Sequence, residues 1–192
     1  MTSTHVKRPV RHLRRAITGL LASSAVLLGS AVLGAHPDHG KILFSATQQD
    51  VAVEGEFRKF SADIEFNPTK PNAGKVTLVI DLASVITGSS EADDLLKDKV
   101  FFDAKHFPQA TFNSKSIDKS AAGQFQARGD FSLKGRSMEL VIPFTARSEG
   151  SGLRIEGHLP ISRLAYKVGE GEWADTGTLA DQVLIMFSLH IP

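Results

Sequence analysis

Apolar and polar residues alternate along most of the chain from position 42 onward. A two-residue period is typical of β-strands that bury one face. The stretches with this pattern are 42–46, 51–57, 62–66, 75–81, 110–116, 124–133, 138–147, 153–161 and 182–191. Several of them reach about ten residues, or roughly 35 Å, which is long for a sandwich and suits a tilted barrel wall. The pattern therefore predicts an all-β fold, a closed antiparallel β-barrel of about eight strands without free edges.

Between residues 81 and 110 the alternation breaks for a helical segment and then resumes. Ser90 is a suitable N-cap, and the acids from Glu91 to Asp94 suit the first turn of a helix. This segment predicts a short helical insertion around 90–105 that covers one open end of the barrel. Its apolar residues either plug that end or line the mouth of a cavity; they are Leu95, Leu96, Val100, Phe101, Phe102 and Phe107.

Small residues interrupt the inward-facing stripes of large ones. They are Ala46, Gly55, Ala62, Ala110, Ala127, Gly129 and Ala146. In an eight-stranded barrel such positions either let the opposite walls meet or leave a ligand cavity, and the pattern leaves both alternatives open. The expected wall of a cavity is Phe44, Phe57, Leu78, Leu95, Phe101, Phe112, Phe125, Phe131 and Leu140. Trp173, in a glycine-rich acidic loop, is expected to cover the ligand or the barrel rim.

The first 35 residues differ in kind from the rest. Five basic residues without an acid precede an apolar run that ends in small residues at Gly34-Ala35. This arrangement predicts a signal peptide at 1–35, a mature domain at 36–192, and a periplasmic or secreted protein. An uncleaved membrane anchor is the alternative interpretation, because the run is long enough to span a bilayer.

Charge and cysteine content exclude several classes of function. Without the first 35 residues, 22 − 5 = 17 basic residues face 21 acidic ones, a formal net charge of −4. A mildly acidic domain without a basic cluster is a poor nucleic-acid binder. The chain has no cysteine, which excludes disulfides, thiol nucleophiles and thiolate metal sites.

Signals for catalysis or metal binding are weak. The chain has no Gly-x-Ser-x-Gly, His-Glu-x-x-His or phosphate-binding glycine motif. His36 and His39 could bind copper or zinc near a new amino terminus, although such a pair without a third fixed ligand is more often part of a solvated tail.

Five ordered motifs resemble the YceI-like family. They are Val53-x-Gly55-x-Phe57-x-x-Phe60; Ile80-Asp81-x-x-Ser84-Val85-x-Thr87-Gly88; Leu95-Leu96-Lys97 with Phe101-Phe102-Asp103 and Phe107-Pro108; Gly129-Asp130-Phe131-Ser132-Leu133-Lys134-Gly135; and Ile161-Ser162-Arg163 with Val168-Gly169-x-Gly171-x-Trp173. After Arg163 the family often has an acidic residue, Phe and Gly, whereas this chain has 164–167 as Leu-Ala-Tyr-Lys.

The resemblance implies a lipocalin-like barrel that binds an isoprenoid lipid, such as a quinone or a polyprenyl chain, without a required cofactor or an enzymatic activity. An apolar lipid is the expected ligand, and transient membrane contact and a homodimer are left open. The alternatives are an enzyme, for example a hydrolase, that acts on an apolar substrate in the same barrel, and a metal-binding exported protein that uses His36 and His39.

Overall fold

The computed structural model describes residues 40–192. The expected signal peptide and the His36 and His39 pair lie outside these residues. The described part is built of ten strands: β1 (Gly40–Gln48), β2 (Val51–Phe57), β3 (Phe60–Glu65), β4 (Lys75–Asp81), β5 (Val85–Ile86), β6 (Gln109–Ala121), β7 (Gln124–Leu133), β8 (Arg136–Glu149), β9 (Gly152–Ser162) and β10 (Leu179–Ile191). One α-helix, α1 (Ser90–Lys97), and the short 3₁₀ turns η2 (Pro71–Ala73), η3 (Leu82–Ser84), η4 (Leu164–Tyr166) and η5 (Gly171–Ala174) complete it.

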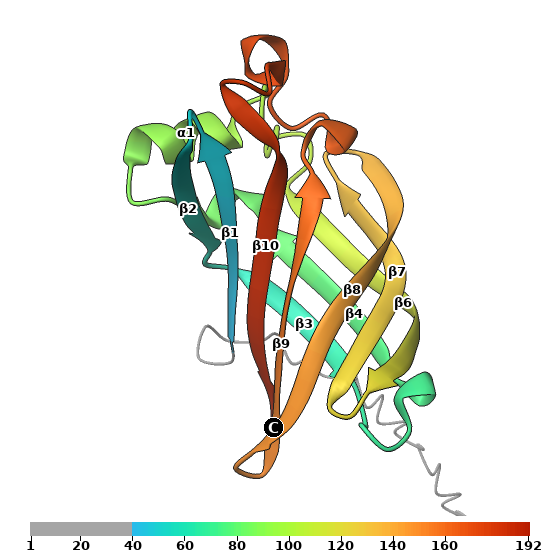
Figure 1. Ribbon diagram of the computed structural model, residues 1–192. Helices are drawn as coiled ribbons and strands as arrows, with labels where there is room; N and C mark the ends of the chain where they lie inside the picture. Colours follow the sequence, from blue (N-terminus) through green and yellow to red (C-terminus); the bar gives the residue numbers. More distant parts are fainter. Residues whose placement is uncertain (1–39) are drawn as a thin grey trace, which may run out of the picture. The chain divides into compact units, whose positions relative to one another are not determined.

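All strand pairs are antiparallel and belong to one curled sheet in the order β3-β4-β6-β7-β8-β9-β10-β1-β2-β5 (Figure 1). The all-β fold and the short helix are confirmed. The closed barrel of about eight strands is not, because β3 and β5 stand at the two ends of the sheet order.

Two bends explain the difference from the expected barrel. Between β2 and β3, the amides of Arg58 and Lys59 donate to the carbonyl oxygen and hydroxyl of Ser84, at 3.1 and 3.0 Å. Between β4 and β5, Asp81 caps η3 by accepting from the Ala83 amide at 2.9 Å. Each bend redirects a strand, so β3 pairs only with β4, and the two-residue β5 pairs only with β2. The sheet curls without a complete ladder around it.

Local chemistry fixes the turns and the helix. Lys134 and Gly135 both have positive φ, 49° and 72°, and join β7 to β8 in a two-residue hairpin. The N-cap of α1 is Ser89 rather than Ser90, because Ser89 has the extended backbone of a cap and its Oγ accepts from the Ala92 amide.

The core consists of two clusters inside the curled sheet. One contains Ile42, Phe44, Phe57, Leu82, Val85, Phe101 and Tyr166, and Leu95 and Trp173 pack against it. The other contains Phe112, Ile117, Phe125, Phe144 and Ile155, and Phe66 packs against it. Figure 1 shows α1 and the segment 164–178 at one end of the sheet and the carboxyl terminus at the other.

Candidate functional site

A cavity of about 250 Å³ lies inside the curled sheet. Inward side chains of β1–β4 and β6–β10 line it, together with residues of α1 and the segments that follow α1 and β9. Only three lining residues have polar side chains, Gln48, Thr87 and Arg163. The site is therefore an apolar space with one charged group in its wall.

The half-buried state of inward residues shows that the space is not filled by side chains. Leu78, Phe131 and Leu140 line the cavity, and none of the three is fully buried. In a close-packed core, large inward side chains of central strands lose nearly all their accessible surface. The structure thus decides between the two alternatives of the sequence analysis in favour of the cavity.

Inward glycines do not by themselves create this space. Gly157 lies opposite Phe187, and a Cβ at Gly157 would lie 2.5 Å from Phe187 Cζ. Gly55 lies opposite Phe44, whose ring a Cβ would also meet. Phenylalanine rings cover these glycines, so the rings lie close to the wall and leave the centre open.

Nine of the ten site residues expected from the sequence line the cavity: Phe44, Phe57, Leu78, Leu95, Phe101, Phe112, Phe131, Leu140 and Trp173. Their contact with a ligand stays a prediction. Phe125 is not among the lining residues. It packs edge-on against Phe66, with ring centroids 5.0 Å apart, and stacks on Phe144 at 5.5 Å. Phe66 and Phe144 themselves line the cavity, whereas Phe125 packs against both of them without lining it.

Aromatic contacts also define the end of the cavity near α1. Phe101 and Trp173 line it with ring centroids 5.4 Å apart, and Phe57 contacts Phe102 at 5.9 Å. The backbone before Trp173 has positive φ at Gly169 (79°) and Gly171 (67°), which glycine adopts without strain. The indole is only half-buried and covers this end of the cavity from the η5 side.

Arg163 is the charged residue among those that line the cavity, and the sequence analysis named it only as part of a family motif. It follows β9 with the same parity as Ile155, Leu159 and Ile161, which also line the cavity, so strand parity could have found it. Its guanidinium donates to four carbonyl oxygens, those of Ala180 (2.9 Å), Val168 (2.9 Å), Gly169 (3.2 Å) and Leu179 (2.5 Å). Burial lowers the pKa of Arg163, and the charge of Asp181 opposes that shift.

Two further buried polar groups lie near Arg163. Lys134 donates to the carbonyl of Lys167 at 2.7 Å and to the carboxylate of Glu170 at 3.0 Å, and this contact lowers the pKa of Glu170. Tyr166 packs edge-on against Phe131, and its hydroxyl is buried without a hydrogen-bond partner among the described residues. Burial raises the pKa of Tyr166.

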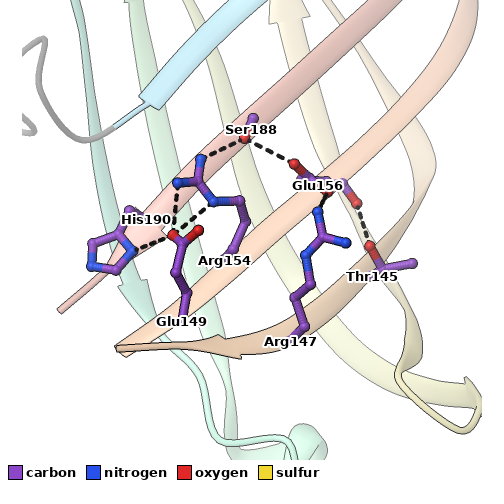
Figure 2. A network of polar contacts seen from close by, with 7 residues as sticks. All are labelled: Thr145, Arg147, Glu149, Arg154, Glu156, Ser188 and His190. Atoms are coloured by element: carbon purple, nitrogen blue, oxygen red, sulfur yellow. Dashed lines mark hydrogen bonds and ion pairs between the residues drawn. The ribbon is translucent and has the colours of Figure 1, made fainter. Parts of the chain in front are cut away.

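A polar network on β8, β9 and β10 lies on the outer face of the sheet (Figure 2). Arg147 and Arg154 are directly opposite each other, and each pairs with a diagonal glutamate, Glu156 and Glu149 respectively. His190 contacts Glu149 at 3.2 Å. The hydrogen bond from Arg154 is the main cause of the lowered pKa of Glu149. These residues have the parity opposite to the cavity-lining ones and connect three strands from outside.

The network contains no paired nucleophile and base. Ser188 donates to Glu156 at 3.3 Å and accepts from Arg154 at 3.1 Å, while His190 contacts Glu149 instead of Ser188. Within residues 40–192, no three histidine or acidic side chains come together as a metal site. None of the helices in that same range has the length and apolar character needed to cross a membrane.

Fold and cavity together define a class: a curled antiparallel sheet wrapped around an apolar internal space. The chain belongs to the YceI-like domain family, whose model matches residues 34–191. The resemblance noted in the sequence is thereby confirmed.

Curated and solved proteins agree with this assignment. A UPF0312 protein of Shewanella baltica is 30% identical over 132 residues, 68% of this chain and 69% of the relative. The crystal structure of Burkholderia cenocepacia BcnA is 37% identical, with a TM-score of 0.78 over 80% of this chain and 96% of BcnA. A domain of Saccharophagus degradans described as polyisoprenoid binding is 18% identical, with a TM-score of 0.64 over 79% of this chain and 92% of that domain, and this likeness shows a shared fold.

Proposed function

We propose that the protein binds an isoprenoid lipid, a quinone or a polyprenyl chain, in the apolar cavity and sequesters or carries it. The observation that carries this proposal is the apolar lining of the cavity, interrupted only by Gln48, Thr87 and Arg163. Each CH₂ group moved from water into such a space contributes about 0.8 kcal/mol. Ordering a flexible chain opposes this gain, so affinity depends on how much of the chain the cavity accepts.

The polyisoprenoid-binding description of the Saccharophagus degradans domain supports the choice of ligand only through the fold. A curled sheet of this kind has the depth to cover a linear chain along the strands. A branched prenyl chain also suits a wall of phenylalanine and leucine side chains such as Phe112 and Leu140, which present apolar surface without fixed polar partners.

Binding rather than catalysis is part of the proposal. Hydrolysis requires a nucleophile and a base within hydrogen-bond reach of each other. The polar side chains on the cavity are an amide, a threonine hydroxyl and a guanidinium, and none of these is a general base near neutral pH. The enzyme alternative therefore lacks its reacting groups in the described cavity.

Export to the periplasm and removal of residues 1–35 complete the proposal, with lipid exchange during transient contact with a membrane. Intact-mass measurement of the protein recovered from the periplasmic fraction tests the export step. Recovery of the full-length chain in the membrane fraction would contradict it. Sedimentation in the presence and absence of lipid tests for a homodimer.

Titration of the lipid-free protein with geranylgeraniol and with a long-chain quinone, followed by calorimetry, tests the binding proposal. We expect saturable binding with about one ligand per chain or per pair of chains. Native mass spectrometry of protein purified from its source identifies what co-purifies. Absence of binding by both probes, together with a ligand-free mass, would refute the proposal.

A further inference from the structure

We infer that the lipid enters and leaves the cavity through the side of the sheet, between β8 and β9, and not through either end. The inference rests on the proposed function, because it specifies the route to the same cavity. It starts from a break in the strand pairing of the wall.

The ladder between β8 and β9 covers only part of the two strands. It runs from the pair Phe144 and Gly157 to the end of β8. Beyond that pair, residues 136–143 of β8 pair only with β7, and residues 158–162 of β9 pair only with β10 (Figure 1). We call the unpaired stretch of wall between 136–143 and 158–162 the side opening.

Two prolines show that the sequence itself produces this break. Pro143 pairs with Gln126 of β7, Pro160 pairs with Leu184 of β10, and neither has a ladder partner across the side opening. Proline has no N–H to donate to a ladder, so within sheets it occurs on edge strands and not between two paired strands. β8 and β9 therefore contain residues typical of edge strands, although they stand in the middle of the sheet order.

Side chains on both strands of the side opening line the cavity. They are Leu140 and Ile142 on β8 and Leu159 and Ile161 on β9. Because no ladder joins the two strands at these residues, side-chain packing holds this part of the wall. Parts of a protein with the fewest backbone hydrogen bonds and buried contacts open at the lowest free energy. The side opening can therefore widen without breaking a strand ladder.

A groove on the outer face meets the cavity where the ladder ends. Its lining residues are Thr145, Glu156, Gly157, His158, Leu184, Met186 and Phe187. Phe187 also lines the cavity, and its ring lies against Gly157, which has no side chain of its own. Phe187 and Gly157 are thus the residues between the groove and the cavity.

Apolar side chains on the outer face lead to the side opening. Val141 on β8 is 39% exposed. Leu184 and Met186 lie on the outer face of β10, where they alternate with residues that line the cavity. Farther along the same strands, the outward residues belong to the polar network, such as Arg147 and His190. An apolar surface that continues into an apolar cavity keeps a lipid chain partly out of water along its path.

Aromatic rings cover the cavity toward its two ends. Near α1, the ring centroids of Phe101 and Trp173 are 5.4 Å apart. In the other core cluster, Phe66 packs edge-on against Phe144 with ring centroids 5.4 Å apart. A lipid that passed through either end would have to separate packed rings.

The other break in strand pairing is held by backbone hydrogen bonds. It lies between β3 and β5, the two ends of the sheet order. There the Asp81 amide donates to the carbonyl oxygen of Lys59, and the Lys59 amide donates to the hydroxyl of Ser84, each at 3.0 Å. At the side opening, Arg136 donates to the carbonyl of Ala165 at 3.1 Å, at the far end of the unpaired stretch. The side opening is therefore the part of the wall best suited to let a lipid pass.

Single cysteines test the route, because the chain has no cysteine and a label then attaches at one position. Val141→Cys places the label beside the side opening. Val51→Cys is the matched control at the end of the sheet, since Val51 is 65% exposed and follows the turn in which the Gln49 amide donates to the Thr178 carbonyl. Each variant is measured before and after reaction with a polyethylene glycol maleimide.

The rates of entry and release are followed by stopped-flow quenching of the single tryptophan with a prenyl quinone, ubiquinone-4. Labelled Val141→Cys should slow entry and release by about tenfold or more each, while labelled Val51→Cys keeps the parent rates. Kd should stay within about twofold of the parent value, because an obstacle on the route slows both directions alike. The unlabelled variants should match the parent.

The outcomes separate the two proposals. Parent rates in labelled Val141→Cys overturn the side route and leave lipid binding intact. Equal or greater slowing in labelled Val51→Cys also overturns it and moves the route to the end of the sheet. A change in one rate alone, with a changed Kd, overturns it too, since the label then acts on the bound lipid. Absence of binding by the parent, in calorimetry with geranylgeraniol and ubiquinone-4, overturns the proposed function and, with it, the route.

Discussion

Replacing Ala127 with tryptophan should occupy the cavity from its wall. Ala127 lies on the inner face of β7, opposite Ile117 and Ile142, and lines the cavity with 4% of its surface exposed. From this position an indole projects toward the centre of the sheet. The cavity measures about 250 Å³, so the ring can enter it instead of displacing the opposite wall.

The expected loss of affinity follows from the length of chain that the indole excludes. An indole takes at least the space of one five-carbon isoprene unit. At about 0.8 kcal/mol per buried carbon, exclusion of one unit costs roughly 4 kcal/mol, or about a thousandfold in Kd. The free energy of unfolding should change little, whereas overpacking of a filled core would cost about 1–3 kcal/mol.

Calorimetric titration with geranylgeraniol and urea unfolding of the lipid-free protein measure the two quantities. Gln126→Trp is the matched control, because Gln126 is the neighbouring residue on β7 and its side chain points to the opposite face. It should retain the parent affinity. Unchanged binding in Ala127→Trp would refute the reasoning, and so would a loss of stability of 1–3 kcal/mol, which indicates a filled core.

Three further changes test other parts of the site. Trp173→Ala should mainly speed lipid release in stopped-flow measurements, because the indole covers the cavity beside Phe101; an unaltered rate would show that it only packs on the rim. Glu170→Gln should lower stability near neutral pH, since Lys134 lowers the pKa of Glu170. That difference should vanish as the pH falls through this lowered pKa, as urea unfolding at several pH values can check. Tyr166→Phe should leave the free energy of unfolding unchanged or raise it by about 1 kcal/mol, because the lost hydroxyl has no partner in the described residues; a clear loss would reveal one.

Most of the correct predictions came from strand parity, that is, from which alternate residues of a strand share one face of the sheet. Alternate residues of 124–133 and 138–147 face the cavity, as their pattern predicts, among them Ala127, Phe131, Leu140 and Ile142. Parity depends only on the alternation of side chains across a strand, so the local sequence is enough to predict it. The helical insertion after residue 81 could also be predicted, because the acidic and capping residues that start α1 lie within one turn of the helix.

The alternation of residues could not show whether the sheet closes into a barrel. Whether β3 and β5 complete a barrel depends on the bends at Arg58 and at Asp81, which are held by Ser84 and Ala83. The contact between Arg58 and Ser84 joins residues 26 positions apart, and alternation within a strand contains no information about such a contact. The sequence therefore predicted every strand except β5, but it wrongly predicted that they close into a barrel.

Phe125 and Arg163 show why parity also fails to define the site. Both share the parity of cavity-lining neighbours, Ala127 and Ile161, yet Phe125 is packed away from the cavity while Arg163 lies in its wall. What separates them is position along the strand. Phe125 meets the ring of Phe66 from a distant turn, whereas Arg163 meets only carbonyl groups, which fix its guanidinium beside the open space. Parity therefore shows which side chains face inward, but the contacts from distant segments determine which of them line the cavity.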